Sequence, residues 1–181
     1  SLNAWDSRAR DMQTTLLRKL GRLEEAEGTA RRSLAADPLD FWAANELRMI
    51  LSARGFDRDS DELAAGLRIK MRDALENYLE LASDYAGCRL YAEAASVLSS
   101  LANNRTPGSS SALLHYELAY YSHQSGDESR ARRHLQQAMS ISSDYGFPFR
   151  LEDVAVLKWA EDKNPQDPRA PYYLGNLLFD R

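Results

Sequence analysis

The chain has 181 residues, of which 44% are hydrophobic and 28% charged, a balance typical of a folded globular protein rather than a disordered one. Its net charge of -4 gives no general attraction to nucleic acid or to an anionic membrane surface. The sequence also contains no run of about 18 apolar residues, the length needed to span a bilayer. We therefore expect neither nucleic acid nor membrane as a partner.

Cys88 is the only cysteine, which excludes an internal disulfide and a thiolate metal cluster. We expect it to be a small packed residue, since a catalytic thiol would need an activating base that the sequence does not suggest. The single cysteine also favours a reducing, cytoplasmic location. The first residues, SLNAWDSRAR, lack an initiating Met and an apolar signal core, which leaves the removal of an upstream segment open.

A helical pair is predicted from residues 16–38, LLRKLGRLEEAEGTARRSLAADP. Its first helix should end at Gly21, because glycine adopts the left-handed conformation of a helix C-terminus without strain. Pro38 prevents the second helix from continuing. Within that second helix, apolar residues recur at every fourth position and share one face: Ala26, Ala30 and Leu34.

The same scheme recurs at a spacing of 34 residues. Gly55 occupies the place of Gly21 one period later, and Ala94 occupies the place of Ala26 two periods later. Three residues are inserted in the loop at 103–111, after which a fourth copy follows with Gly126 and Ala131. A fixed period of this length is the signature of a repeat architecture.

This pattern resembles the tetratricopeptide repeat (TPR), a helix–turn–helix unit of about 34 residues. The family's leucine midway along the first helix is matched by Leu47, Leu81, Leu118 and Leu174, and its small residue in the second helix by Ala26, Ser60, Ala94 and Ala131. The chain departs from the pattern at Gln13 and Asp153, and it keeps the closing proline only at Pro38 and Pro165. The resemblance covers nearly the whole chain. It implies an all-α fold, an α-solenoid of stacked repeats in a right-handed superhelix.

We predict a single TPR-like array over residues 1–181. Its repeats are expected at about 7–40, 41–74, 75–108 and 112–145, followed by a half-repeat at 146–166 and a truncated repeat at 168–181. The half-repeat is expected because only 22 residues separate Ser143 from Pro165, too few for a helical pair. We expect one second-type helix there, with Val154, Leu157 and Ala160 facing inward and Phe147 and Phe149 filling the gap against the stack.

The last segment, NPQDPRAPYYLGNLLFDR, reads as the first helix of a further repeat. Without the second helix of that repeat, the apolar side chains of Leu174, Leu177 and Leu178 are expected to be uncovered. We therefore interpret the ending as a cut through a longer array.

The resemblance to TPR proteins implies that first helices line a concave groove, which holds an extended peptide or a partner's helix. The candidate groove residues are Asp11, Asn45, Met49, Tyr116, Tyr120, His123, Tyr172 and Asn176. Tyr116 and Tyr120 lie one turn apart, so both rings can stand side by side. A pair of hydroxyl-bearing rings suits a peptide or a sugar. The alternative is that these tyrosines pack against the neighbouring repeat.

The best-known TPR peptide binders clamp a C-terminal carboxylate with Lys, Arg and Asn side chains of the first helices. The corresponding positions here hold Asp11, Thr15, Glu46, Glu76 and Glu80. These acidic residues would repel a carboxylate, so a clamp of this kind is not expected.

No catalytic or metal site is expected, and no cofactor. Glu76, Glu80 and Asp84 form an acidic stripe along one helix, which is more typical of a solvated face than of an acid–base or Ca²⁺ site. His115 and His123 lie two turns apart, too far to chelate one ion. The sequence also lacks a phosphate-binding loop and a nucleophile elbow, so we expect no enzyme activity.

Three functional hypotheses remain. The first is a protein–protein interaction scaffold, whose groove holds a peptide or another domain of the same parent chain. The second is an accessory module in carbohydrate processing, since residues 144–181 resemble TPR regions of large uncharacterised bacterial proteins with an upstream carbohydrate-related β domain. This resemblance rests on the motifs FPFR and APYYLGNL. The third is self-association into a homo-oligomer through exposed ends of the array.

Overall fold

The computed structural model describes residues 4–104, 107–142 and 147–179. Within these ranges the regular structure is helical throughout, which confirms the predicted all-α class. None of the described helices is long and apolar enough to cross a membrane. The chain divides into two compact units, Ser1–Arg72 and Asp73–Arg181.

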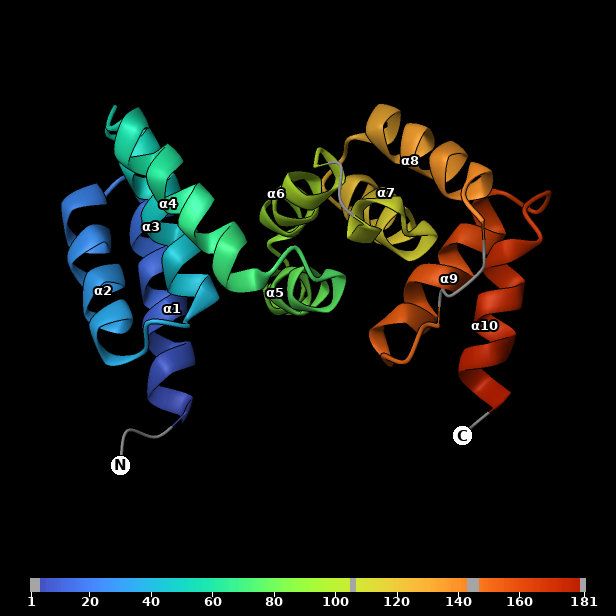
Figure 1. Cartoon of the computed structure of the whole chain (residues 1–181), viewed down its shortest axis with the longest axis horizontal. Helices are drawn as coiled ribbons and strands as arrows, with labels where there is room; N and C mark the ends of the chain where they lie inside the picture. Colours follow the sequence, from blue (N-terminus) through green and yellow to red (C-terminus); the bar gives the residue numbers. More distant parts are fainter. Residues whose placement is uncertain (1–3, 105–106, 143–146, 180–181) are drawn as a thin grey trace. The chain divides into compact units, whose positions relative to one another are not determined.

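Unit 1 is built from two helical hairpins. In the first, α1 (Ala4–Lys19) pairs with α2 (Leu23–Ala36), and in the second, α3 (Phe41–Ala53) pairs with α4 (Asp57–Met71). Because α3 packs on both α1 and α2, the second hairpin stacks on the first (Figure 1). Their common core contains Leu17, Ala26, Ala30, Leu47, Ile50 and Leu51.

Unit 2 continues the same scheme. Its first four helices form the hairpins α5 (Leu75–Gly87) with α6 (Tyr91–Ala102) and α7 (Ala112–Gln124) with α8 (Glu128–Ser140). A 3-10 turn (Pro107–Ser110) precedes α7, and α7 packs on α6. The remaining helices are α9 (Glu152–Lys163), which packs on α7, and α10 (Arg169–Phe179), which packs on α9.

Every hairpin from α1 to α8 turns through a residue in the left-handed region. Gly21, Gly55 and Gly126 have φ angles of 75°, 82° and 88°, and Arg89 has a φ of 60°. The residue that follows each of them donates its backbone N–H to a carbonyl five residues earlier, at 2.9 Å in all four turns: Arg22 to Leu17, Phe56 to Leu51, Leu90 to Tyr85 and Asp127 to Ser122. This bond closes the C-terminus of the first helix and directs the second helix back along it.

The second helix of each hairpin carries a small side chain at the position that the period predicts. The residues at this position are Ala26, Ser60, Ala94 and Ala131, and all four are buried. A larger side chain would push the two helices apart, because a packed interior tolerates little added volume. The small residues predicted from the period are therefore buried in all four hairpins.

Several expectations about the C-terminal part are wrong. Phe147 and Phe149 are 69% and 58% exposed, whereas Pro148 between them is buried. The segment 147–150 is not helical, so alternate side chains point to opposite sides and the two rings turn outward. Leu177 is buried instead of being uncovered, since α10 packs on α9. Ser143 and Gly146 lie outside the described residues.

Cys88 also differs from its predicted role as a packed residue, because it is exposed. It follows directly after α5, in the turn that leads to α6, where side chains point to solvent.

The turn at Arg89 gives a direct test of the repeat geometry. We expect Arg89→Gly to raise the free energy of unfolding by about 1 kcal/mol, because a side chain in the left-handed region costs about 1–2 kcal/mol. Urea denaturation followed by circular dichroism measures the change. Arg89→Ala is the matched control, since it removes the charge but keeps Cβ, and equal stability of the two variants would contradict the proposed strain.

Candidate functional site: the first-helix faces

The predicted groove residues lie on α1 and α3 in unit 1 and on α7 and α10 in unit 2. We call the side of α1 and α3 that carries Asp11, Asn45 and Met49 the unit 1 face. We call the side of α7 that carries Tyr120 and His123, together with Trp159 of α9, the unit 2 face.

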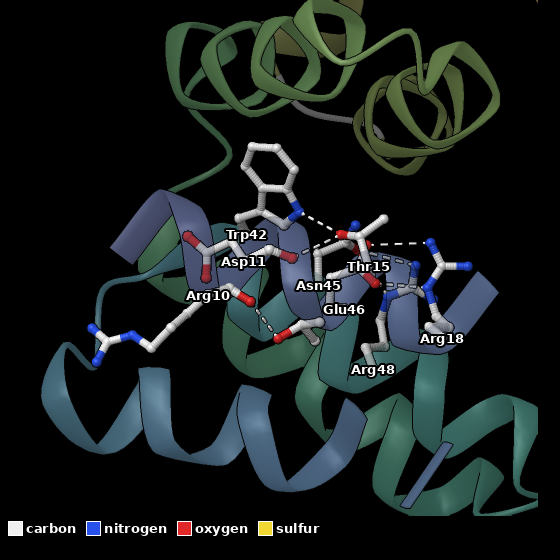
Figure 2. A network of polar contacts seen from close by, with 9 residues as sticks. Arg10, Asp11, Thr15, Arg18, Trp42, Asn45, Glu46 and Arg48 are labelled. Carbon is white, nitrogen blue, oxygen red and sulfur yellow. Dashed lines mark hydrogen bonds and ion pairs between the residues drawn. The ribbon is translucent and has the colours of Figure 1, made fainter. Parts of the chain in front are cut away.

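The unit 1 face holds a network of polar contacts between α1 and α3 (Figure 2). Nε of Arg18 donates to Oε2 of Glu46 at 2.7 Å, and a second guanidinium nitrogen lies 3.3 Å from Oε1. Nε1 of Trp42 donates to the hydroxyl of Thr15 at 3.1 Å. Glu46 is fully buried, so the paired Arg18 is what makes its negative charge tolerable there.

Asp11 lies at the other end of this network and is buried beside Asp40. Burial and the neighbouring Asp40 raise the pKa of Asp11 to about 7, although Arg10 opposes the shift. Asp40 in turn accepts a hydrogen bond from the backbone N–H of Ala43 at 2.9 Å, which caps the N-terminus of α3. Asp11 therefore belongs to the contact between α1 and the start of α3.

The other predicted residues of unit 1 differ in accessibility. Asn45 is buried, and its Oδ1 accepts hydrogen bonds from the guanidinium of Arg48 at 3.1 and 3.3 Å. Met49 is half-buried. Among the three predicted residues of this face, Met49 offers the most surface to a ligand.

Tyr116 is fully buried within unit 2. Its hydroxyl donates to Oδ2 of Asp167 at 2.5 Å, and its ring meets Tyr173 of α10 edge to face at 6.2 Å. Burial and the adjacent Asp167 raise the pKa of Tyr116, so the hydroxyl stays protonated. Tyr116 thus connects α7 to Asp167 and to α10. This agrees with the alternative that these tyrosines pack against the neighbouring repeat.

Tyr120 and His123 are half-buried and share an aromatic neighbour in Trp159. The ring of Trp159 lies 5.6 Å from that of Tyr120 and 5.1 Å from that of His123. The imidazole of His123 also pairs with the carboxylate of Glu128 at the start of α8. Trp159 was not among the residues predicted from the sequence, because the apolar spacing of its helix indicates only Leu157 and Ala160 as inward-facing residues.

Tyr172 and Asn176 lie one turn apart on the exposed side of α10. The ring of Tyr172 is tilted against that of Tyr173 at 5.8 Å, and Tyr173 itself faces the core. The exposed acids Glu76 and Glu80 lie on α5, in keeping with a solvated acidic face.

His115 and His134 come together across the α7–α8 hairpin, which the sequence did not suggest. Their Nδ1 atoms lie 3.0 Å apart, and the two rings stack at 5.2 Å. Burial lowers the pKa of His115, and burial together with His115 and Arg130 lowers that of His134 to about 4, so one neutral ring donates to the other. Within the described ranges no group of three or more His, Cys, Asp and Glu residues could hold a metal ion.

Comparison with known proteins adds little to this geometry. No protein-family model matches the chain. No curated protein matches it either. Solved structures with a similar arrangement include MamA, at 16% identity and a TM-score of 0.39, where the match covers 92% of each chain.

Two further solved structures with a similar arrangement are bacterial proteins. PilF of Pseudomonas aeruginosa matches at 15% identity and a TM-score of 0.40, over 97% of this chain and 77% of its own. The TPR protein TTC0263 of Thermus thermophilus matches at 20% identity and a TM-score of 0.38, over 96% and 99%. Matches this distant say nothing about what the chain binds. The chain's own structure consists of successive helical hairpins, as the resemblance to TPR proteins predicted.

The buried pair in unit 1 predicts a measurable loss of stability. We expect Arg18→Met to lower the free energy of unfolding by about 3 kcal/mol, because it removes the guanidinium that pairs with the buried carboxylate of Glu46. Arg58→Met is the matched control: Arg58 pairs with Glu62 at the surface and is 90% exposed, so its loss should change stability very little. Equal effects of the two substitutions in urea denaturation would contradict the role given to Glu46.

Proposed function

We propose that the chain is a non-catalytic scaffold that binds a peptide or a partner domain through its first helices. The observation that carries this proposal is the unit 2 face, where the half-buried rings of Tyr120 and His123 on α7 meet the half-buried ring of Trp159 on α9. Rings with polar atoms at their edges combine a large contact area with directional hydrogen bonding, as in the hot spots of protein interfaces. Tyr120 and His123 carry such atoms, whereas Nε1 of Trp159 is buried, so Trp159 adds contact area only.

The side chains beneath this face are packed against neighbouring helices, which lowers the entropy lost on binding. Tyr121, next to Tyr120 on α7, is buried and stacks on Tyr91 of α6 at 6.4 Å. On the opposite flank, Trp159 is held by α9, whose Leu157 and Ala160 are buried in the core of unit 2. A ligand would therefore meet side chains that are already in place.

We propose the remaining predicted groove residues as additional contacts that offer a ligand less surface area. Tyr172 and Asn176 can extend a binding surface along α10, and Met49 can do so in unit 1. Asp11, Asn45 and Tyr116 are proposed only as contacts that a rearrangement of their helices would have to expose. A cytoplasmic location and a partner domain in the same parent chain also stay predictions.

Two other functions are alternatives to the interaction scaffold. In the first, the chain is an accessory carbohydrate-associated module of a larger bacterial protein, and the aromatic rings stack on sugar. In the second, the chain self-associates through its exposed apolar side chains, which include Leu16 of α1, Leu20 directly after α1, and Leu178 and Phe179 of α10.

Selection from a random-peptide phage library tests the scaffold. We expect peptides bound by the intact chain to lose at least tenfold in affinity for the double variant Tyr120→Ala and His123→Ala, because it removes two of the three rings. The matched control is Arg132→Ala with Gln136→Ala, on the exposed side of α8. Circular dichroism confirms that both variants fold. Unchanged affinity in the first variant would contradict the proposal.

Fluorescence titration and light scattering of the same chain distinguish the two alternatives from the scaffold. A saturable change in tryptophan fluorescence with cello- or malto-oligosaccharides, together with a failure to select peptides, would favour the carbohydrate module. A molar mass that rises with concentration in light scattering, and that Leu20→Glu with Phe179→Glu returns to the monomer value, would favour self-association.

A further inference from the structure

Two carboxyl groups meet inside unit 2, where α9 packs on α7. Glu117 of α7 is 3% exposed and Asp153, in the first turn of α9, is 0% exposed. Oδ2 of Asp153 accepts a hydrogen bond from the backbone N–H of Arg150 at 3.2 Å. Oε2 of Glu117 and Oδ1 of Asp153 are buried without a hydrogen-bond partner among the described residues.

Two ionised carboxylates cannot both be accommodated at this place. A carboxylate only accepts hydrogen bonds, so a donor appears between the two groups only when one of them is protonated. Burial is the largest cause that raises the pKa of Glu117, to about 8, and the neighbouring Asp153 adds to it. Burial raises the pKa of Asp153 as well.

The charged and titratable groups that act on the pair lie on α7 and at the start of α9. Tyr121 of α7, which stacks on Tyr91 of α6, forms a hydrogen bond with Glu117. This hydrogen bond lowers the pKa of Glu117, but burial raises it by more. Arg150, just before α9, attracts both carboxyl groups and also lies 4.0 Å from Glu152. On α8, His134 meets His115, which lies two residues before Glu117 and so on a different side of α7.

We propose that Glu117 and Asp153 share a single proton that holds α9 against α7, and that release of this proton to solvent loosens the α9–α10 pair from the rest of unit 2. The shared proton supplies the one donor between the two groups. Without it, two adjacent buried negative charges repel across the joint. Loosening α9 also moves Trp159 away from Tyr120 and His123, so the joint controls the unit 2 face.

The direction of the pH dependence follows from linkage. When α9 is detached, Glu117 ionises near its ordinary pKa of 4.5, whereas in the packed joint its pKa is about 8. Between these values the packed joint binds a proton that the detached state has lost. Detachment therefore becomes easier as pH rises through this window, and its pH dependence levels off above about 8.

Hydrogen exchange followed by mass spectrometry tests the proposal on the full chain. After correction for the intrinsic pH dependence of exchange, we expect the opening constant of α9 to rise about tenfold per pH unit between about pH 5 and 8. Glu117→Gln should abolish this rise, because its amide donates to Asp153 at any pH. Asp11→Asn is the matched control. It removes the carboxyl group of unit 1 whose pKa is raised, and it should leave the pH dependence of α9 opening unchanged.

Two results would overturn the proposal. One is a pH-independent opening of α9 in the wild-type chain, and the other is an equal pH dependence in Glu117→Gln. If Glu117→Gln does not fold, infrared spectroscopy of the Asp11→Asn chain decides. A protonated carboxyl band present at pH 7 and lost as pH passes about 8 supports the shared proton, and the absence of that band at pH 7 refutes it.

Discussion

The fold depends on one recurring constraint, the short turn that returns each second helix along its first helix. A left-handed residue and a backbone hydrogen bond close the turn at 2.9 Å in four hairpins, at Gly21, Gly55, Arg89 and Gly126. With the turn fixed, the second helix lies against the first, and a small buried residue on it leaves room for close packing. Ala26, Ala94 and Ala131 are such residues, so one local geometry builds the hairpins of both units.

Close helix packing also determines which of the predicted groove residues stay exposed. Polar side chains between neighbouring helices become contacts of the fold: Arg18 pairs with Glu46, and Tyr116 bonds Asp167. What stays half-exposed on unit 2 is the set of rings formed by Tyr120, His123 and Trp159. The same helix contact buries Glu117 against Asp153, so the face and the acid pair share one joint between α7 and α9.

Local features were predictable from the sequence, and long-range partners were not. The period located the turn glycines and the small buried residues of the second helices, because both depend on the backbone and volume of one short segment. The partner of Tyr116 lies 51 residues away, and the neighbour of His115 lies 19 residues away on the next helix. Apolar spacing shows which side of a helix is buried but not what covers it. For the same reason Phe147 and Phe149, bulky and apolar, were wrongly expected inside.

The central claim is that the first-helix face of unit 2 binds a partner. Hydrogen exchange of the chain with and without a library-selected peptide at saturation tests this most directly. The account predicts that slowing of exchange in unit 2 concentrates on α7 and α9, where Tyr120, His123 and Trp159 lie, and leaves the exposed side of α8 unchanged. Protection on α8 with none on α7 and α9 would contradict it.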